Sequence, residues 1–190
     1  MHINSYNILD KIIASFRSKE LKKNFSLKDK IILDFGCGSN FPQIKKVYNQ
    51  CREVTLVDRV TDNFKDGKYS FINYDNDLSI LKNNISNSHY DIIILSAVIE
   101  HLDNPEYILN ILKTKLNGDG VFFLTAPGKK SQPLLEFMAY KLGVINADLI
   151  REHKRYYDKN EYILLSQKTN MNIKKFYHFE LGMNTACILK

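Results

Sequence analysis

The ten residues Ile31–Asn40, IILDFGCGSN, decide the fold of this 190-residue chain. They begin with a short apolar run, which predicts a strand buried on both faces, as the strands of parallel sheets are. Two glycines follow the strand, and the next segment, 41–48, has a helical pattern with Asn40 as its N-cap. A strand, a glycine turn and a helix in this order predict the first unit of a doubly wound α/β nucleotide-binding sheet.

Asp34 decides which kind of nucleotide ligand suits this turn. The third glycine of the dinucleotide pattern G-x-G-x-x-G is missing, because Phe41 stands three positions after Gly38. A carboxylate at the mouth of the turn would repel a pyrophosphate. It suits a ligand that carries positive charge, such as the ammonium group of an amino acid.

The segment Asp34–Gly38 resembles the D-x-G-C-G first motif of the class I S-adenosylmethionine (SAM) dependent methyltransferases of the small-molecule type. The resemblance covers the chain from Lys30 to Lys190. It implies a Rossmann-like doubly wound sheet of about seven strands, mostly parallel with an antiparallel last strand, and helices on both faces. It also implies S-adenosyl-L-methionine as the cofactor.

Alternating apolar segments along the chain agree with this fold class. Further strands are expected at 53–58, 68–74, 90–96, 121–128, 172–179 and 184–189, with helices at 78–85, 106–115, 131–142 and 159–168 and a turn at 117–120.

Acidic residues follow the second and third strands. Asp58 ends the second strand, where a carboxylate can accept two hydrogen bonds from the ribose diol of a nucleoside. Taken alone it would be a solvated turn residue, but its place after the glycine turn favours the ribose role. The resemblance implies that Asp75 and Asn76 hold the adenine, whereas Asp77 is the N-cap of the next helix. The register of this loop stays open by a residue or two.

The resemblance supplies the complete set of cofactor candidates, which share a position at the ends of the first four strands. They are Asp34, Gly36, Cys37, Gly38, Asp58, Arg59, Asp75, Asn76 and Ser96.

Two histidines are the catalytic candidates. A sulfonium methyl is already activated, so the enzyme mainly orients the acceptor and excludes water, but a hydroxyl acceptor also gains from a base. His101 lies in a Glu-His-Leu segment that resembles a signature after the fourth strand of many small-molecule methyltransferases, and His153 lies in a polar, aromatic segment. The alternatives are a His101 that only shapes the pocket and a His153 that is an exposed loop residue. The substrate candidates are Glu100, Arg155 and Tyr156.

The chain is expected to form one domain, 1–190, with two unassigned pieces. Residues 1–29 form an N-terminal helix, with apolar spacing over 3–17, and a charged connection. Residues 128–157 form an insertion over the carboxyl ends of the strands, where ligands bind in open α/β sheets, and are interpreted as a substrate lid.

Composition and residue spacing limit which metal sites, cellular locations and macromolecular partners are expected. Cys37, Cys51 and Cys187 form neither a disulfide framework nor a zinc pattern, and the histidines and acids show no ligand spacing, so no metal is expected. The sequence shows no apolar run long enough to span a membrane and no signal peptide, so a cytoplasmic location is expected. The net charge of +6 comes mainly from lysines without a dense cluster, which favours a solvated surface over a nucleic-acid site.

The sequence therefore predicts a SAM-dependent methyltransferase whose acceptor is a small molecule, at an oxygen of a sugar, a polysaccharide precursor or a metabolite. Two alternatives stay open: a methyltransferase that acts on RNA, and a SAM-binding module without turnover. Amino methylation of DNA is disfavoured, because 96–99 reads Ser-Ala-Val-Ile where an Asn/Asp-Pro-Pro-aromatic run is needed. The oligomeric state is not predicted.

Overall fold

The computed structural model describes residues 8–59, 62–75, 77–87, 89–143 and 147–190. The strands are β1 (Ile31–Phe35), β2 (Glu53–Asp58), β3 (Phe64–Asp66), β4 (Tyr69–Asn73), β5 (Tyr90–Ser96), β6 (Leu116–Pro127), β7 (Ile173–Phe179) and β8 (Asn184–Leu189). The helices are α1 (Ile8–Asn24), α2 (Phe41–Val47), α3 (Leu78–Asn83), α4 (Pro105–Lys113), α5 (Gln132–Tyr140), α6 (Ala147–Arg151) and α7 (Lys159–Thr169), with short 3₁₀ turns η1 (Lys129–Ser131) and η2 (Glu180–Gly182).

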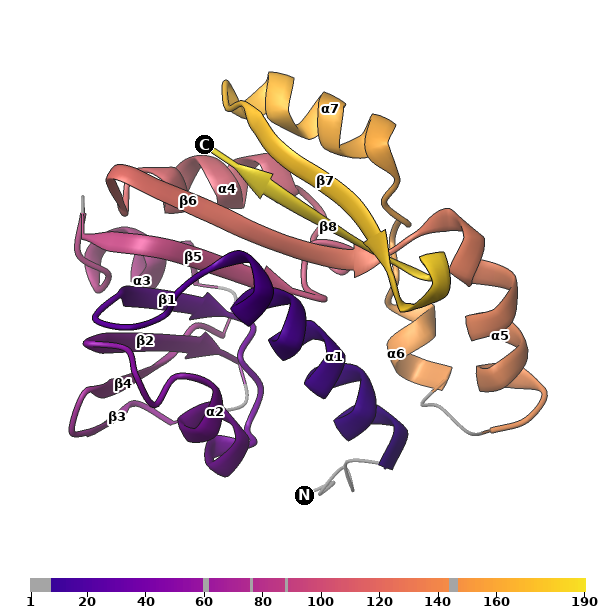
Figure 1. The fold of residues 1–190 in the computed structure, drawn as a ribbon, viewed down its shortest axis with the longest axis horizontal. Helices are drawn as coiled ribbons and strands as arrows, with labels where there is room; N and C mark the ends of the chain where they lie inside the picture. The colour runs from indigo at the N-terminus through magenta and orange to yellow at the C-terminus, as the bar shows by residue number, and fades with distance from the viewer. Residues whose placement is uncertain (1–7, 60–61, 76, 88, 144–146) are drawn as a thin grey trace.

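The strands form one sheet in the order β3-β4-β2-β1-β5-β6-β8-β7 (Figure 1). The five strands from β4 to β6 in this order are parallel, and β8 runs antiparallel to both of its neighbours. This arrangement confirms the expected fold class. The one addition is β3, an exposed edge strand that pairs antiparallel with β4 and stacks Phe64 on Phe71, with ring centroids 4.0 Å apart.

Apolar cores lie on both faces of the sheet. Alternate residues of β1 enter different cores: Ile31 and Leu33 pack with α3, α4 and α7, whereas Ile32 packs with α1 and α2. A strand covered on both faces needs apolar side chains at consecutive positions. This explains why the first strand of the sequence reads as an unbroken apolar run.

Two boundaries expected from the sequence are wrong. The N-terminal helix does not end near residue 17 but continues to Asn24, because Leu21 is only 3% exposed and completes the core under α1. The first residues of the expected helix lie outside the described part of the chain. The expected turn at 117–120 is part of β6, where an added Cβ at Gly120 would lie 2.7 Å from the carbonyl oxygen of Tyr90. The strand continues there because glycine lets the two backbones approach closely.

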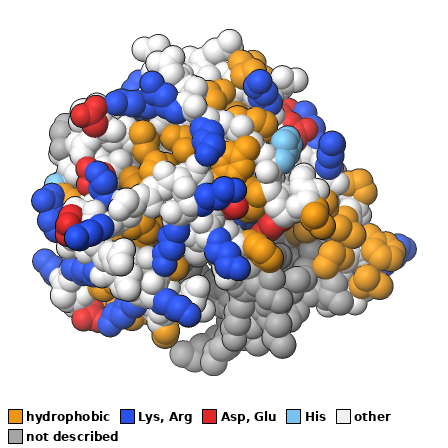
Figure 2. Space-filling model, in the orientation of Figure 1, with side chains coloured by type: hydrophobic (Ala, Val, Ile, Leu, Met, Phe, Trp, Pro, Cys, Tyr) orange, Lys and Arg blue, Asp and Glu red, His pale blue; other side chains and the backbone are white. Residues whose placement is uncertain are grey.

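The segment 128–157 contains α5 and α6, and Figure 1 shows both helices beyond the carboxyl ends of the parallel strands. The apolar spacing of 131–142 predicts a helix with one apolar face, but most of that face of α5 is not buried. Its exposed large side chains are Leu134, Phe137 and Tyr140, followed by Leu142, and Figure 2 shows hydrophobic side chains gathered in this part of the surface. Among the helices of the described ranges, none is both long enough and apolar enough to cross a membrane.

A buried lysine lies where strands β5 and β6 begin. Lys115 is 1% exposed, and its ammonium group donates to the carbonyl oxygens of Lys82 and Ile85, each at 2.8 Å, and to Oδ1 of Asn87 at 2.6 Å. All three donor positions of the ammonium group therefore have acceptors. The lysine ties the end of α3 to the start of β6.

Lys115→Met is predicted to lower the free energy of unfolding by about 2–4 kcal/mol, because it leaves buried carbonyl oxygens without a donor. Lys46→Met, at an exposed position of α2, is the matched control and should change it by less than about 0.5 kcal/mol. Urea denaturation of both variants measures the difference. Equal effects would show that the lysine contributes nothing beyond its hydrocarbon stem.

Candidate active site

The candidate cofactor residues gather where β1, β2 and β5 end. These strands are adjacent and parallel, with Phe35 opposite Val57 and Asp34 opposite Ile94. Their carboxyl ends therefore share one edge of the sheet. The turn after β1, the tip of β2 and the turn after β5 meet at this edge.

The glycine turn after β1 is held against its neighbours. The N–H of Gly36 donates to the carbonyl oxygen of Val57 at 2.7 Å. Gly36 and Gly38 have φ values of 81° and 70°, in the left-handed region that favours glycine. A Cβ at Gly36 would lie 2.3 Å from Cγ2 of Val98, so the turn after β5 packs directly on this glycine.

Asp58 also touches this turn. Its Oδ2 accepts a 2.7 Å hydrogen bond from the N–H of Gly38. The bond holds the carboxylate beside the glycine turn. This is the position in which a ribose-binding acid was predicted from the sequence. Asn40 caps α2, as expected, because its side chain accepts from the N–H of Gln43.

Asp34 is the buried acid of the turn. It is 8% exposed, and its Oδ2 accepts a 2.7 Å hydrogen bond from the hydroxyl of Tyr48. Burial raises the pKa of Asp34 to about 7; the Tyr48 bond opposes this rise and the charge of Asp58 adds to it. Tyr48 was not among the site residues predicted from the sequence. Its position at the end of α2, the helix that follows the glycine turn, could have indicated it.

Cys37 lies half-buried in the same turn. Burial raises the pKa of its thiol far above the usual value, and the charges of Asp34 and Asp58 act in the same direction. The thiol therefore stays protonated, and a thiolate nucleophile is disfavoured there.

The remaining cofactor candidates differ in what surrounds them. Arg59 and Asp75 are exposed, and Asp75 has a positive φ of 36°. Asn76 lies outside the described residues. Asp77 is the N-cap of α3, as expected, because its carboxylate accepts from the N–H of Ser79 at 2.8 Å. Ser96, at the end of β5, pairs its hydroxyl with that of Thr125 at 3.0 Å.

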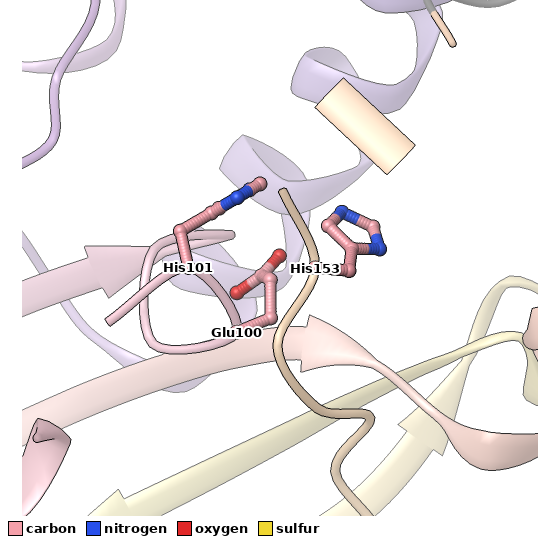
Figure 3. A group of neighbouring side chains, drawn as sticks. All are labelled: Glu100, His101 and His153. Atoms are coloured by element: carbon pink, nitrogen blue, oxygen red, sulfur yellow. The ribbon is translucent and has the colours of Figure 1, made fainter. Parts of the chain in front are cut away.

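Glu100, His101 and His153 form one cluster, although His153 is distant in sequence. Figure 3 shows Glu100 and His101 on the turn after β5 and His153 facing them from the segment after α6. One ligand atom from each of the three side chains lies within 4.8 Å of the others. The two imidazole centroids are also 4.8 Å apart. Because Val98 packs on Gly36, this cluster begins two residues from a direct contact with the glycine turn.

Burial shifts the titration of all three groups. It raises the pKa of Glu100 to about 7, against the opposing charge of Arg17. It lowers the pKa of His153 to about 4, with the nearby His101 and Arg17 acting in the same direction, and it lowers the pKa of His101. Both imidazoles are therefore neutral at pH 7, the form that accepts a proton or ligates a metal.

Backbone contacts hold His153 in this place. The N–H of Lys154 donates to the carbonyl oxygen of Glu100 at 2.8 Å, and the hydroxyl of Tyr157 donates to that of Ile99 at 3.3 Å. The ammonium group of Lys154 pairs with Asp103. The segment 153–157 is thus fastened along the turn after β5.

The two expected substrate residues of the segment 153–157 differ in their distance from the histidines. The ring of Tyr156 packs edge-on against His153, with centroids 5.5 Å apart, so it borders the cluster. Arg155 is exposed, and its guanidinium donates to the carbonyl oxygen of Asp103 at 3.3 Å. The structure thus brings Glu100 and Tyr156 to the histidines and leaves Arg155 at the surface.

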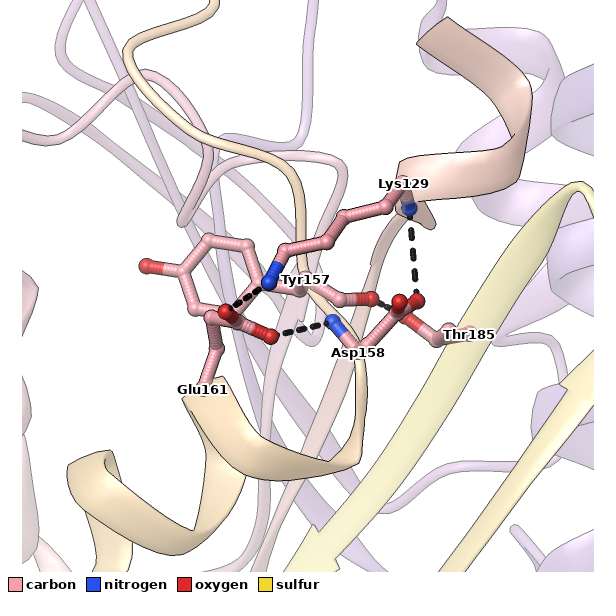
Figure 4. A network of polar contacts seen from close by, with 5 residues as sticks. All are labelled: Lys129, Tyr157, Asp158, Glu161 and Thr185. Atoms are coloured by element: carbon pink, nitrogen blue, oxygen red, sulfur yellow. Dashed lines mark hydrogen bonds and ion pairs between the residues drawn. The ribbon is translucent and has the colours of Figure 1, made fainter.

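A second network fastens both ends of the insertion (Figure 4). The N–H of Lys129 donates to Asp158 at 3.3 Å, and its ammonium group pairs with Glu161, which also accepts from the N–H of Asp158 at 2.9 Å. The hydroxyl of Thr185 lies 3.1 Å from the carbonyl oxygen of Tyr157. Residues 129 and 157–158, at the two ends of the insertion, are thereby joined to each other and to β8.

Gly36→Ala is predicted to destabilise the fold and weaken SAM binding, because the new methyl group meets Val98. Gly67→Ala is the matched control, since Gly67 has a φ of 58° but nothing within 4 Å of an added Cβ. Both variants carry the strain of a left-handed alanine, about 1–2 kcal/mol. Gly36→Ala should cost about 1–3 kcal/mol more, the usual cost of overpacking.

Urea denaturation and calorimetric titration with S-adenosylhomocysteine measure the two effects. The double variant Gly36→Ala/Val98→Ala should recover part of the lost stability and affinity. If the two glycine variants behave alike, the close approach of the two turns is not a constraint.

Comparison with known proteins agrees with this geometry. The family model for the methyltransferase domain matches residues 8–175. A ubiquinone biosynthesis O-methyltransferase of Rickettsia bellii is 24% identical, over 88% of this chain and 72% of that protein.

Solved structures share the fold. A SAM-dependent methyltransferase from Archaeoglobus fulgidus superposes with a TM-score of 0.69 at 17% identity, over 98% of this chain and all of the other. One from Mesorhizobium loti has a TM-score of 0.66 at 12% identity, over 90% and 95% of the two chains. The chain belongs to the methyltransferase-domain family, and it is an enzyme that uses S-adenosyl-L-methionine as its cofactor.

Proposed function

We propose that the enzyme transfers the methyl group of SAM to an oxygen of a small-molecule acceptor, which is bound between the turn after β5 and the segment 153–157. The observation that carries the proposal is the cluster of Glu100, His101 and His153 beside the glycine turn. The O-methyltransferase relative from Rickettsia bellii supports transfer to oxygen.

The turn after β1 fits the amino-acid part of SAM. Asp34 offers a buried carboxylate to the ammonium group, and the glycines leave room for the ligand against the backbone. Asp58 fits the ribose hydroxyls, and Asp75 with Asn76 the adenine. In this orientation the sulfonium carries its activated methyl group toward the turn after β5. Ser96, Cys37 and Arg59 border the same site.

The histidine cluster fits the acceptor end. A hydroxyl group is a weak nucleophile until its proton leaves, and a neutral imidazole can accept that proton. Both histidines are half-buried and neutral, and Tyr156 offers an aromatic wall beside them. The insertion 128–157 acts as the lid that keeps water out, since its two ends are joined to each other and its last residues are bonded to the turn after β5.

A panel assay tests the acceptor class. We expect S-adenosylhomocysteine to be released only with hydroxylated small molecules, phenols and sugars among them, and mass spectrometry of the product to find the methyl group on oxygen. Turnover with transfer RNA alone would establish the RNA alternative. SAM binding without turnover on any acceptor would indicate a binding module.

His153→Ala should lower turnover by about 10²–10⁴-fold with SAM affinity nearly unchanged.

SAM affinity is predicted to rise about tenfold between pH 6 and pH 8. The ammonium group of SAM binds the ionised carboxylate of Asp34, and the buried acid, with a pKa of about 7, is mostly protonated at pH 6 and mostly ionised at pH 8. Calorimetric titration across this range measures the profile.

Tyr48→Phe is the control for this profile. The variant loses the hydrogen bond that lowers the pKa of Asp34, so the midpoint should move to higher pH. Titration of the ligand's own groups is common to both proteins and cancels in the comparison. If the native chain and Tyr48→Phe show the same dependence of SAM affinity on pH, Asp34 does not bind the ammonium group.

A further inference from the structure

We propose that Glu100, His101 and His153 bind a divalent transition-metal ion, and that Zn²⁺ is the ion they suit best. One ligand atom of each side chain lies within 4.8 Å of the other two. These residues show no metal-binding pattern in their spacing, because the third ligand, His153, comes from the part of the insertion that follows α6.

The cluster contains buried polar atoms without partners. Seven buried side-chain nitrogen or oxygen atoms of the described residues have no hydrogen-bond partner, and three of them belong to this cluster: Oε2 of Glu100, Nδ1 of His101 and Nδ1 of His153. Glu100 is 1% exposed, so its carboxylate cannot turn to solvent. Buried polar atoms in folded proteins nearly always have a partner. Three such atoms from three neighbouring side chains indicate a ligand shared among them.

The types of donor atom select the ion. Two imidazole nitrogens and one carboxylate oxygen form a set found in catalytic zinc sites, where a fourth position stays open. Magnesium and calcium prefer oxygen ligands throughout and suit this set poorly. Methyl transfer moves an electron pair and needs no redox change, which favours an ion with one stable oxidation state.

The geometry needs a small adjustment to close around the ion. Zinc–ligand bonds of about 2.0–2.1 Å place tetrahedral ligands roughly 3.3 Å from one another, against a largest separation of 4.8 Å here. The N–H of Lys154 is already bonded to the carbonyl oxygen of Glu100 at 2.8 Å. The backbone of the insertion is therefore in place, and rotation of the His153 side chain supplies the remaining approach.

The surrounding charges are nearly balanced. Arg17 acts electrostatically on all three side chains, and Arg59 acts on His101. Glu152, next to His153 in sequence, adds a negative charge near His101. With Glu100 ionised, two acids stand against two arginines, so a dication is not excluded by the local charge.

The role of the ion rests on the proposed function, whereas its binding does not. The acceptor hydroxyl would take the open position, and the ion would lower the pKa of that hydroxyl, so that its proton passes to solvent as the acceptor enters and before water is excluded. The acceptor oxygen then forms a bond to the methyl carbon while the carbon–sulfur bond breaks, and that electron pair stays on sulfur. With the ion bound, His101 and His153 are its ligands, and the ion takes over the activating role that a neutral imidazole has in its absence.

Metal binding is tested on the full chain after treatment with a chelator and gel filtration. Calorimetric titration with Zn²⁺ should show one ion per chain. His101→Ala and His153→Ala should each weaken binding by more than about 100-fold, because changing a residue that only supports a metal ligand already costs about 10–100-fold. His178→Ala, at an exposed position of β7, is the matched control and should bind as the native chain does.

Cobalt substitution gives a second readout. Co²⁺ in the native chain should show the visible absorption bands of a four-coordinate site, and His153→Ala should lose them while its circular dichroism stays native. Glu100→Gln, which keeps the side-chain shape, should also weaken binding. Absence of Zn²⁺ binding, or equal binding by all variants, overturns the metal site.

The two proposals fail separately. SAM-dependent turnover by a chain that binds no Zn²⁺ would overturn the metal site and leave the proposed function intact. Stoichiometric Zn²⁺ binding that depends on His153, without turnover on any acceptor, would support the metal site and contradict the proposed function.

Discussion

The close approach of two turns organises the active end of this enzyme. Gly36 has no side chain, so Val98 can pack directly on the backbone of the turn after β1. The turn proposed to hold the cofactor and the turn that carries Glu100 and His101 thereby become neighbours. A residue with a Cβ at position 36 would push the two turns apart.

A second constraint brings the insertion to the same place. The N–H of Lys154 and the hydroxyl of Tyr157 bond to carbonyl oxygens of the turn after β5, and the network of Lys129, Asp158 and Glu161 joins the two ends of the insertion. These contacts explain why His153 lies beside His101 rather than in solvent. The cluster proposed to bind the acceptor therefore depends on a segment outside the sheet.

The sequence predicted the sheet well because its information there is local. Buried strands read as apolar runs, and the turn of Gly36 and Gly38 and the acid at Asp58 stand directly at strand ends. The edge strand β3 was missed because its three residues are exposed and carry no apolar pattern. The end of α1 was misplaced because lysines surround Leu21, and only tertiary packing shows that this leucine is buried.

Contacts between distant residues could not be predicted from spacing. The bond from Tyr48 to Asp34 joins the end of a helix to a strand, and the pairing of His101 with His153 depends on how the insertion folds back. The apolar side chains of α5 suggested burial, but the helix projects past the sheet and exposes them. Local patterns thus indicated the glycine turn and the acids at the strand ends, whereas the cluster of Glu100, His101 and His153 became visible only in the fold.

We propose that the glycine turn after β1 and the histidine cluster face each other across the transferred methyl group. A crystal structure with S-adenosylhomocysteine bound would show whether they do. We expect the amino group of the ligand to contact Asp34 and its sulfur to face the cluster of Glu100, His101 and His153. A ligand whose sulfur points away from these residues, or one that binds elsewhere and leaves the turn empty, would contradict it.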